Sequence, residues 1–491
     1  MPSELDQICT ACGLCDGSRC AAIATQAGHK FDLPDTLPSN YDGRRYTADA
    51  MDCALPIALD SHSGCSFSCL YCFANNLQRA PDRNKAALQK MIDQGTFYSE
   101  WSLQKLEKFL DRSCDDVLSK SMYPMLDRGL PVQLGALGDP FDDLERHTGW
   151  ARRAIPLFIK YKVPVRVGTK GGITLQRPEY RKLFERSPEQ FWFAWSIICN
   201  SDELISKIDV NAPVTSDRLK AMRGLTDLGC NCSIRFRPFL PGVSDSYPGE
   251  PEAWKTLIYR ARQVGARAIS FEFIFLDAVP TARQKAMSRL MFRYMGNPRF
   301  GEEWRKMSDR RESCLRGSRA YKFDMTMKVR EYVHSLDMTF GCSDPAFKEF
   351  NDTGCCCGMP ETGDKWFSNW SRRQMTEVIV QAKRLYDAGT PRQFNYLDWA
   401  PEWAHLTGLS SMVALNSWHA HRMKKNTTFG DHMRNKWNDP SHPRGPYIYF
   451  GKVLKPIAVD SGTGDLIYEY RPWYKGYDHS FMGEPNARPN P

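Results

Sequence analysis

The sequence has 491 residues and contains no apolar run of the roughly 18 residues that a membrane-spanning helix requires. Its first residues lack the basic start and the apolar stretch of a secretory signal. Repeats of fixed period and long low-complexity stretches are also absent, so a repeat architecture is not expected. These absences predict a cytoplasmic protein without a membrane partner. The length allows one large catalytic domain with additions, or two to three domains.

The positive charge of the chain is unevenly placed. Residues 1–60 carry nine acidic and four basic residues, a balance of −5, although the whole chain has a formal net charge of +9. The remaining residues therefore carry +14. Such an excess suits a polyanionic partner such as nucleic acid, and it also occurs on ordinary solvated surfaces.

Cysteine is unusually abundant, with 17 copies. In a secreted chain they would indicate disulfides, whereas clustered cysteines in a large cytosolic chain favour metal binding or redox chemistry. Six of them are scattered, namely Cys53, Cys114, Cys199, Cys230, Cys232 and Cys314. The others form three groups, which are Cys9, Cys12, Cys15 and Cys20, then Cys65, Cys69 and Cys72, then Cys342, Cys355, Cys356 and Cys357.

Short apolar runs alternate with helical patterns from about residue 54 onward. The runs have the Val, Ile, Phe and Trp content of buried parallel strands, and they predict strands at 55–59, 131–137, 164–168, 191–198, 232–237 and 267–275. Helices are predicted between them at 99–112, 147–161, 215–228 and 251–264. This rhythm implies βαβ units with right-handed crossovers. The expected fold class is therefore α/β, with a partial (β/α)6-type barrel whose chemistry lies at the carboxyl ends of the strands.

Further elements are expected outside this core. A helix at 318–335 and a strand at 336–340 follow it, then an amphipathic helix at 371–388 and a hairpin-like pair at 447–459 and 465–471. Residues 21–50 are turn-rich and read as a connector. We expect a cysteine-rich N-terminal segment, a barrel core, a region that completes the barrel and carries cysteines, and a basic and aromatic extension, at residues 1–50, 51–280, 281–395 and 396–491.

Cys65, Cys69 and Cys72 form a C-x3-C-x2-C triplet on one tight loop after the first predicted strand. Each thiolate can bind one iron of a [4Fe–4S] cluster, to which the usual ferredoxin supplies a fourth cysteine. A missing fourth ligand leaves one iron open to a cofactor or substrate, much as catalytic zinc sites keep one position free. A structural zinc site with His62 as fourth ligand is the alternative, although this spacing fits zinc poorly.

The triplet, with the aromatic Tyr71 before its last cysteine, resembles the signature of the radical SAM superfamily, and the resemblance extends over about residues 54–280. It implies that the open iron binds S-adenosylmethionine (SAM), whose reductive cleavage yields methionine and a 5′-deoxyadenosyl radical that abstracts hydrogen from the substrate. The resemblance also implies an electron donor such as flavodoxin or ferredoxin. It places Tyr71 beside the adenine of SAM.

Residues after the later strands look most like the spore photoproduct lyase-like branch of that superfamily. Gly138 and Asp139 occupy the position that often contacts the amino group of SAM, although the more usual Gly-Gly-Glu form is absent. By the same resemblance, Lys170 pairs with the SAM carboxylate, for which a cation is apt, and Ser196 contacts the cofactor. Arg235 or Arg237 is expected to line the same mouth, and a structural role at the strand end is the alternative.

The N-terminal cysteines predict an auxiliary [4Fe–4S] cluster for electron delivery. Cys9, Cys12, Cys15 and Cys20 resemble a bacterial ferredoxin run with one extra residue before the last cysteine. A zinc knuckle is the alternative.

The cysteines after the barrel predict a second auxiliary cluster. Cys342 with Cys355, Cys356 and Cys357 is its candidate ligand set, and Cys314 is a further candidate. Because successive side chains diverge, the three adjacent cysteines are not all expected to bind one cluster.

Two further residues are catalytic candidates. Cys199, just past the strand that carries Ser196, could donate hydrogen to a substrate radical, or it could be a small buried hydrophobe. Glu272 could act as an acid or base if it points inward from its strand.

The C-terminal region combines basic and aromatic residues. Such residues suit phosphates and base stacking, and an aromatic-rich lid is the alternative. They are Trp418, His419, His421, Arg422, Lys424, Lys425, Arg434, Lys436, Trp437, Tyr447, Tyr449, Tyr468, Tyr470, Trp473 and Tyr474.

These features predict a radical SAM enzyme that acts on nucleic acid, DNA rather than RNA, by an isomerase- or lyase-type change to a hypermodified pyrimidine. Such a base must usually leave the stack to reach a buried centre. The second hypothesis is a peptide-maturing radical SAM enzyme with auxiliary clusters. The third is a non-catalytic iron–sulfur protein that binds nucleic acid, which would not need a three-cysteine cluster followed by a barrel.

Overall fold

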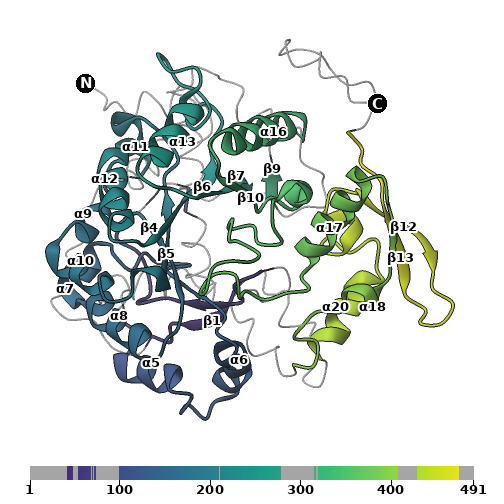
Figure 1. Ribbon diagram of the computed structural model, residues 1–491, viewed down its shortest axis with the longest axis horizontal. Helices are drawn as coiled ribbons and strands as arrows, with labels where there is room; N and C mark the ends of the chain where they lie inside the picture. Colours follow the sequence, from purple (N-terminus) through teal and green to yellow (C-terminus); the bar gives the residue numbers. More distant parts are fainter. Residues whose placement is uncertain are drawn as a thin grey trace, which may run out of the picture.

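An eight-stranded sheet lies at the centre of the molecule and carries helices along one face (Figure 1). The computed structural model describes residues 41–47, 53–67, 69, 71–72, 99–209, 211–277, 314–316, 319–406 and 428–474, with side chains at all of these except 275–277 and 314–316. Within those ranges, we find no helix with the length and apolar character needed to cross a bilayer.

The strands of the described residues form three sheets. The large sheet has the order β1-β2-β3-β4-β5-β6-β7-β10, a small one β11-β13-β12, and β8 pairs with β9. The strands are β1 (Arg44–Tyr46), β2 (Ile57–Leu59), β3 (Val132–Leu134), β4 (Val165–Thr169), β5 (Phe191–Ser196), β6 (Asn231–Phe239), β7 (Ala268–Phe273), β8 (Phe275–Asp277), β9 (Cys314–Arg316), β10 (Thr339–Cys342), β11 (Gln393–Phe394), β12 (Leu454–Val459) and β13 (Leu466–Tyr470).

The helices alternate with the strands of the large sheet and then continue into the C-terminal region. They are α5 (Leu103–Leu110), α6 (Val117–Asp127), α7 (Asp143–Thr148), α8 (Trp150–Lys160), α9 (Gly172–Leu175), α10 (Pro178–Phe184), α11 (Asp202–Ile208), α12 (Thr215–Thr226), α13 (Ala253–Gln263), α16 (Arg319–Ser335), α17 (Met375–Asp387), α18 (Tyr396–Trp399), α20 (Phe429–Trp437) and α21 (Pro446–Tyr449), with 3₁₀ turns η2 (Pro188–Gln190) and η3 (Pro345–Phe350).

The predicted α/β class with a parallel sheet is confirmed. The six predicted strands and the one predicted at 336–340 run parallel to their neighbours from β2 to β10. Within the described residues β1 and β10 do not pair, so the sheet stays open as a partial barrel.

Three local predictions differ from the structure. The first arm of the hairpin expected at 447–459 contains helix α21, and strand β12 begins only at Leu454. β1 lies inside the expected connector and pairs antiparallel with β2, because burial of Tyr46 stabilises a strand too short to leave a pattern. The helix expected at 371–388 begins only at Met375, where Gln374 and Glu377 form a capping box.

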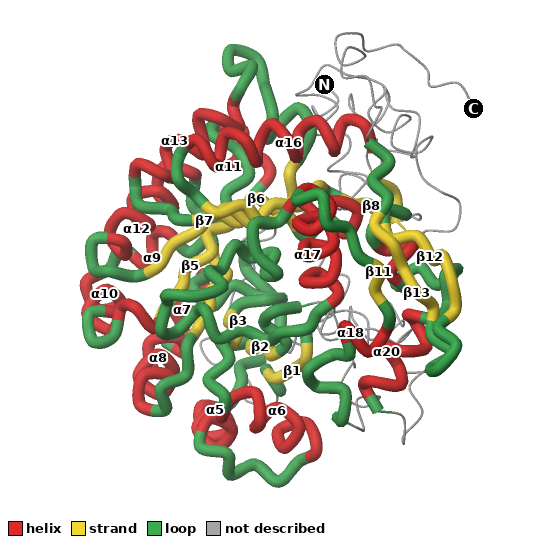
Figure 2. The backbone as a smooth tube through the Cα atoms, turned by 45° about the vertical axis from the view of Figure 1, so that its right-hand side comes forward, coloured by secondary structure: helices red, strands yellow, loops and turns green. Residues whose placement is uncertain are grey.

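The two faces of the large sheet differ in composition. Successive side chains of a strand point to opposite faces. The outer face packs under the helices and belongs to the main hydrophobic core, with Val165, Phe193 and Ile269 as examples (Figure 2). The inner face carries small or polar residues at the paired positions of neighbouring strands, among them Gly168, Ala194, Ser233, Arg235 and Ser270.

The segment at 353–372, hereafter the inner segment, covers part of the inner face. It forms a second hydrophobic cluster with Trp192 and Ala268 of that face. Ser270 Oγ donates to the Cys356 carbonyl at 3.0 Å near one edge of the sheet, and the Ser371 amide donates to the Ala54 carbonyl at 3.0 Å near the other. The inner segment therefore bridges the two edges that no strand joins.

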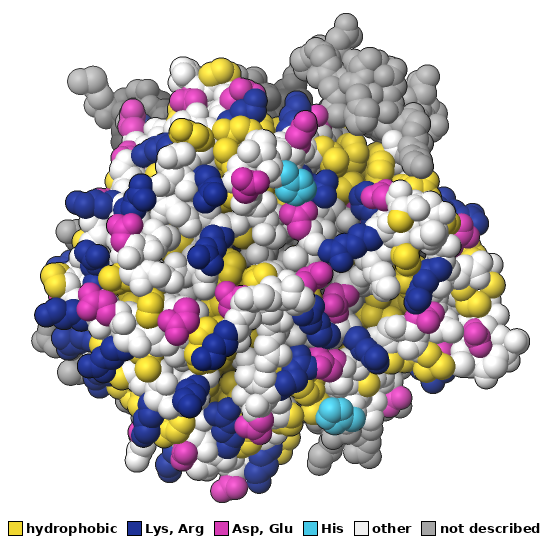
Figure 3. All heavy atoms as spheres, viewed as in Figure 1, with side chains coloured by type: hydrophobic (Ala, Val, Ile, Leu, Met, Phe, Trp, Pro, Cys, Tyr) yellow, Lys and Arg dark blue, Asp and Glu magenta, His cyan; other side chains and the backbone are white. Residues whose placement is uncertain are grey.

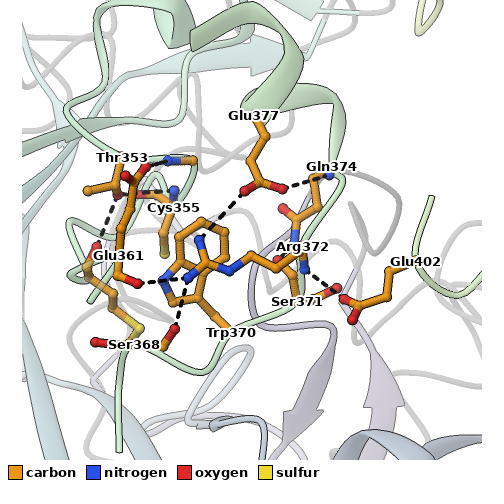
Figure 4. A network of polar contacts seen from close by, with 12 residues as sticks. Thr353, Cys355, Glu361, Ser368, Trp370, Ser371, Arg372, Gln374, Glu377 and Glu402 are labelled. Atoms are coloured by element: carbon orange, nitrogen blue, oxygen red, sulfur yellow. Dashed lines mark hydrogen bonds and ion pairs between the residues drawn. The ribbon is translucent and has the colours of Figure 1, made fainter. Parts of the chain in front are cut away.

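Arg372 organises the end of the inner segment (Figure 4). Its guanidinium carbon lies 3.6 Å from the ring centroid of Trp370, and its Nη2 donates to the carbonyls of Glu361 at 2.9 Å and Ser368 at 3.0 Å. Its backbone amide donates to Glu402 at 2.8 Å. The contact of the Arg372 guanidinium with the Trp370 ring and these hydrogen bonds together stabilise the inner segment, which contains no helix or strand.

Candidate functional site

The cysteine triplet lies on the loop that follows β2, at the carboxyl ends of the parallel strands. The charges of Cys69 and Cys72 both act on Cys65, and all three cysteines are free of disulfides, but among the described residues no group of three or more His, Cys, Asp or Glu side chains is placed closely enough to hold a metal ion. Burial, followed by nearby acidic groups, raises the pKa of Cys65 well above its ordinary value. A bound metal ion converts buried thiols of this kind into thiolates, so the chemistry of the three thiols fits an iron–sulfur cluster, although their placement in this structure does not form a ligand set.

Neighbouring loops fix the course of the cysteine loop. Asp142 accepts hydrogen bonds from the amide of Ser66 at 2.7 Å and from its hydroxyl at 3.0 Å. Asn211 donates through its side chain to the Ser66 carbonyl at 3.1 Å. A Cβ at Gly138 would lie 2.8 Å from the Gly64 carbonyl oxygen, so only glycine allows this approach. These contacts hold the ligands before any metal binds.

His62 has partners of its own. Its Nε2 lies 3.4 Å from Asp142 Oδ1, and its Nδ1 shares a hydrogen bond of 2.8 Å with the Ser61 hydroxyl. Burial works against protonation, but Asp142 outweighs it and raises the pKa of His62. Its Nε2 has no hydrogen-bond partner in the described part of the chain, so His62 stays the candidate fourth ligand of the zinc alternative.

Asp60, which the sequence reading missed, organises the loop after β3. Its Oδ1 accepts from the backbone amides of Ala136 at 2.9 Å, Leu137 at 2.8 Å and Gly138 at 3.2 Å. Its Oδ2 accepts from Arg45 Nε at 3.2 Å. The position of Asp60 directly after an apolar strand was the feature of the sequence that could have identified it as a site residue. The carboxylate makes this loop a rigid wall of the site.

We expect Asp60→Ala to lower the free energy of unfolding by about 3 kcal/mol or more, because it leaves three amides and one guanidinium without their buried acceptor. Chemical denaturation measures this loss. The matched control is Asp115→Ala, since the Asp115 side chain is fully exposed. Equal stability of the two variants would contradict this role of Asp60.

Asp139 and Lys170 meet where β3 and β4 end. Asp139 Oδ2 accepts from the Lys170 amide at 2.5 Å, and Oδ1 accepts from the Thr169 hydroxyl at 2.8 Å. Burial is the main cause that raises the pKa of Asp139 to about 6. Both oxygens of Asp139 therefore accept hydrogen bonds within the protein, and Oδ2 fixes the backbone of Lys170. The cofactor contact expected for Asp139 stays a prediction.

The Lys170 ammonium lies over Tyr71 of the cysteine loop, 5.1 Å from the ring centroid. Burial opposes its charge, but Asp209 and Cys69 outweigh burial and raise the pKa of Lys170. A cation held between an aromatic ring and the cysteine loop is suited to bind a carboxylate there. The structure thus brings together two residues that are 99 positions apart in the chain.

Asp209 and Arg218 form a fully buried ion pair at 2.8 Å behind this lysine. Arg218 also donates to the Ser196 carbonyl at 2.8 Å. Burial opposes ionisation of Asp209, but Lys170 and Arg218 hold its pKa below the ordinary value. The sequence reading missed both residues, because nothing in their local pattern distinguishes them from surface charges.

Ser196 and Arg235 are paired across β5 and β6 on the inner face. Ser196 is 7% exposed and ends its strand. Glu272 points to the same face from β7, 3.9 Å from Arg237 Nη1. Cys199 is fully buried, and its sulfur accepts from the Ser201 amide at 3.4 Å, which favours the hydrophobe alternative.

The cysteines of the inner segment lie near Cys53, whereas the sequence predicted Cys342 as their neighbour. Cys356 and Cys357 both act electrostatically on Cys53, which the sequence reading left among the scattered cysteines. Cys342 pairs in register with Phe271 and belongs to the outer core. The sheet therefore separates Cys342 from the inner cysteines, because one residue of register decides the face.

Cys355 is buried in the inner hydrophobic cluster. Cys314 is described by its backbone alone, on β9. The N-terminal group lies outside the described residues, namely Cys9, Cys12, Cys15 and Cys20.

The described part of the C-terminal extension is packed inward. Trp437, Tyr468 and Tyr470 are at most 2% exposed, and Arg434 forms a bidentate pair with Asp465 at 2.7 and 2.8 Å. These side chains fit the lid alternative and offer no face to a base. On the face drawn in Figure 3, basic and acidic side chains are interspersed. The remaining basic and aromatic candidates at 418–425 lie outside the described residues.

Comparison with known proteins gives similarity at the level of solved structures. No protein-family model and no curated protein matches the chain. Spore photoproduct lyase complexed with dinucleoside spore photoproduct matches with a TM-score of 0.38 and 12% identity over 65% of this chain and 92% of that one. Streptococcus suis SuiB bound to S-adenosylmethionine matches with a TM-score of 0.30 and 11% identity over 46% and 43%. These similarities are low and identify no activity for the chain.

Proposed function

We propose that this protein is a radical SAM enzyme that abstracts hydrogen from a base of a nucleic acid, DNA in particular. The observation that carries the proposal is the Lys170 ammonium over Tyr71, on the same loop after β2 that carries the free cysteines Cys65, Cys69 and Cys72. When bound, a [4Fe–4S] cluster with an open iron holds SAM and supplies the electron that cleaves it to methionine and a 5′-deoxyadenosyl radical.

The residues of the chain bind and position in this proposal. Lys170 pairs with the carboxylate of SAM. Asp139 holds Lys170 in place by accepting a hydrogen bond from its backbone amide, and Asp209 attracts its ammonium group. Ser196 contacts the cofactor from the end of β5. The inner segment shields the inner face from water, which a radical site requires.

An auxiliary [4Fe–4S] cluster is part of the proposal. Cys356 and Cys357 are its ligands, and Cys53 replaces Cys342 as the third. Because the N-terminal cysteines are expected to hold another cluster, the test is the change on substitution. Cys356→Ala is expected to lower the bound iron by about four per chain after reconstitution, and unchanged iron would contradict this cluster.

The substrate class rests on the resemblance to the spore photoproduct lyase-like branch at Gly138, Asp139, Lys170 and Ser196, and on the balance of +14 after residue 60. We expect an isomerase- or lyase-type change to a modified pyrimidine.

Anaerobic reconstitution with iron, sulfide, SAM and a reductant tests the proposal. We expect the reconstituted protein to form 5′-deoxyadenosine from SAM. After incubation with DNA, we expect mass analysis of the nucleosides to show an altered one. Absence of 5′-deoxyadenosine under every condition would end the radical SAM proposal. Formation of 5′-deoxyadenosine with unchanged DNA and a modified peptide would favour the peptide-maturing alternative.

A further inference from the structure

Three arginines gather on the inner face, below the candidate cofactor site. Arg166 lies on β4 and is 1% exposed, while Arg235 and Arg237 lie on β6. Arg235 is paired in register with Ser196 of β5. Alternation along the strands directs all three to the face that also carries Gly168 and Ser196.

These arginines retain donors that the protein does not use. Arg166 Nη1 donates to Gln133 Oε1 at 3.2 Å, but its Nε and Nη2 are buried without an acceptor in the described part of the chain. The Nε atoms of Arg235 and Arg237 are also buried without an acceptor among the described residues. Buried polar groups are nearly always paired, so four orphaned N–H groups on neighbouring side chains indicate a bound acceptor.

The local charge is also unbalanced. Among the described residues, Glu272 is the one carboxylate that forms an ion pair with any of the three, at 3.9 Å from Arg237. Arg237 Nη2 donates to the carbonyl of Cys356 at 3.0 Å, which is neutral. Burial, then the charges of Arg237 and Arg166, lower the pKa of Arg235 to about 10. Cys356 and Cys357 also act on Arg237, and Cys357 acts on Arg235. Arg166 has none of these groups as an ion-pair partner in the described part of the chain, so the cluster of three cations favours a further anion.

The backbone makes room for this cluster. A Cβ at Gly168 would lie 3.3 Å from Arg235 Nη1 and 2.8 Å from the Gly135 carbonyl oxygen. Arg235 therefore extends from β6 across the inner face to β4, the strand of Arg166. Its guanidinium lies over Gly168, two positions before Lys170.

We propose that Arg166, Arg235 and Arg237 bind a phosphate group of the nucleic-acid substrate and so fix the reacting base below the cofactor. The inference rests on the proposed function and names the part of the substrate that the barrel recognises. A phosphate offers several acceptor oxygens and at least one negative charge, and guanidinium groups match that geometry. A nucleoside without phosphate would leave the donors unpaired.

Titration calorimetry on the full chain, without iron or SAM, tests the site. We expect thymidine 5′-monophosphate to bind at least about tenfold more tightly than thymidine, and inorganic phosphate to compete with it. Arg235→Gln is expected to remove about tenfold or more of that affinity and to leave thymidine binding unchanged. The control is Arg146→Gln on α7, whose side chain is 58% exposed. Equal binding of the two ligands, or equal affinity of Arg235→Gln and wild type, would overturn the proposal.

Thermal unfolding separates a ligand site from a structural role. Without phosphate, Arg235→Gln is expected to unfold at a higher temperature than wild type, because it removes an uncompensated buried charge. With excess phosphate the order is expected to reverse, because the ligand stabilises only the wild-type site. A lower midpoint in both conditions would show that Arg235 is structural and overturn the inference. Since neither assay uses SAM, failure here leaves 5′-deoxyadenosine formation as a separate test of the proposed function.

Discussion

Replacement of Cys69 by alanine is expected to abolish the formation of 5′-deoxyadenosine. The structure places Cys69 with Cys65 and Cys72 on one loop, so that loss of one thiol leaves two ligands for a four-iron cluster. Two thiolates do not hold such a cluster, and the electron that cleaves SAM then has no route. Anaerobic turnover with SAM and a reductant measures the loss, and the bound iron is expected to fall by about four per chain.

Cys114→Ala is the matched control for this experiment. Cys114 is also free and partly buried, but it lies before α6, and its backbone is bonded to the Tyr123 hydroxyl. The control is expected to retain iron and activity. If Cys69→Ala kept both as well, the triplet would not be the ligand set.

Arg218→Ala is expected to lower the free energy of unfolding by about 3–5 kcal/mol. The Arg218–Asp209 pair has no exposed side-chain surface, and removal of one partner leaves the other charge buried without compensation. The change also removes the donor to the Ser196 carbonyl and releases the acid that holds Lys170. Weaker SAM binding is therefore expected together with the loss of stability.

Urea denaturation at several pH values measures this effect. Lys170 and Arg218 keep the pKa of Asp209 lower in the folded than in the unfolded chain. A lowered folded pKa stabilises the protein above the unfolded carboxyl value of about 3.9, and this stability is lost as pH falls through the folded pKa. The wild type is thus expected to lose more stability on acidification than Arg218→Ala. Parallel curves for the two proteins would contradict the role of the pair.

Much of the fold was predictable because its signals are local. Apolar runs in the sequence predicted the seven parallel strands, because both faces of such a sheet are covered. β1 was not predictable, because its three residues depend on pairing with β2. For the aromatic tail two alternatives stayed open, because composition does not distinguish a ring that stacks on a base from one buried like Tyr468.

The sequence by itself determined which residues are the candidate cluster ligands, because the spacing of Cys65, Cys69 and Cys72 is short and one loop carries it. Only the tertiary structure decided what surrounds that loop. The pairing of Asp209 with Arg218, the place of Cys53 beside the inner segment and the gathering of the buried arginines all join residues from different strands and loops. Such contacts are set by strand register and by which face a side chain occupies, and neither is written in any local stretch of the chain.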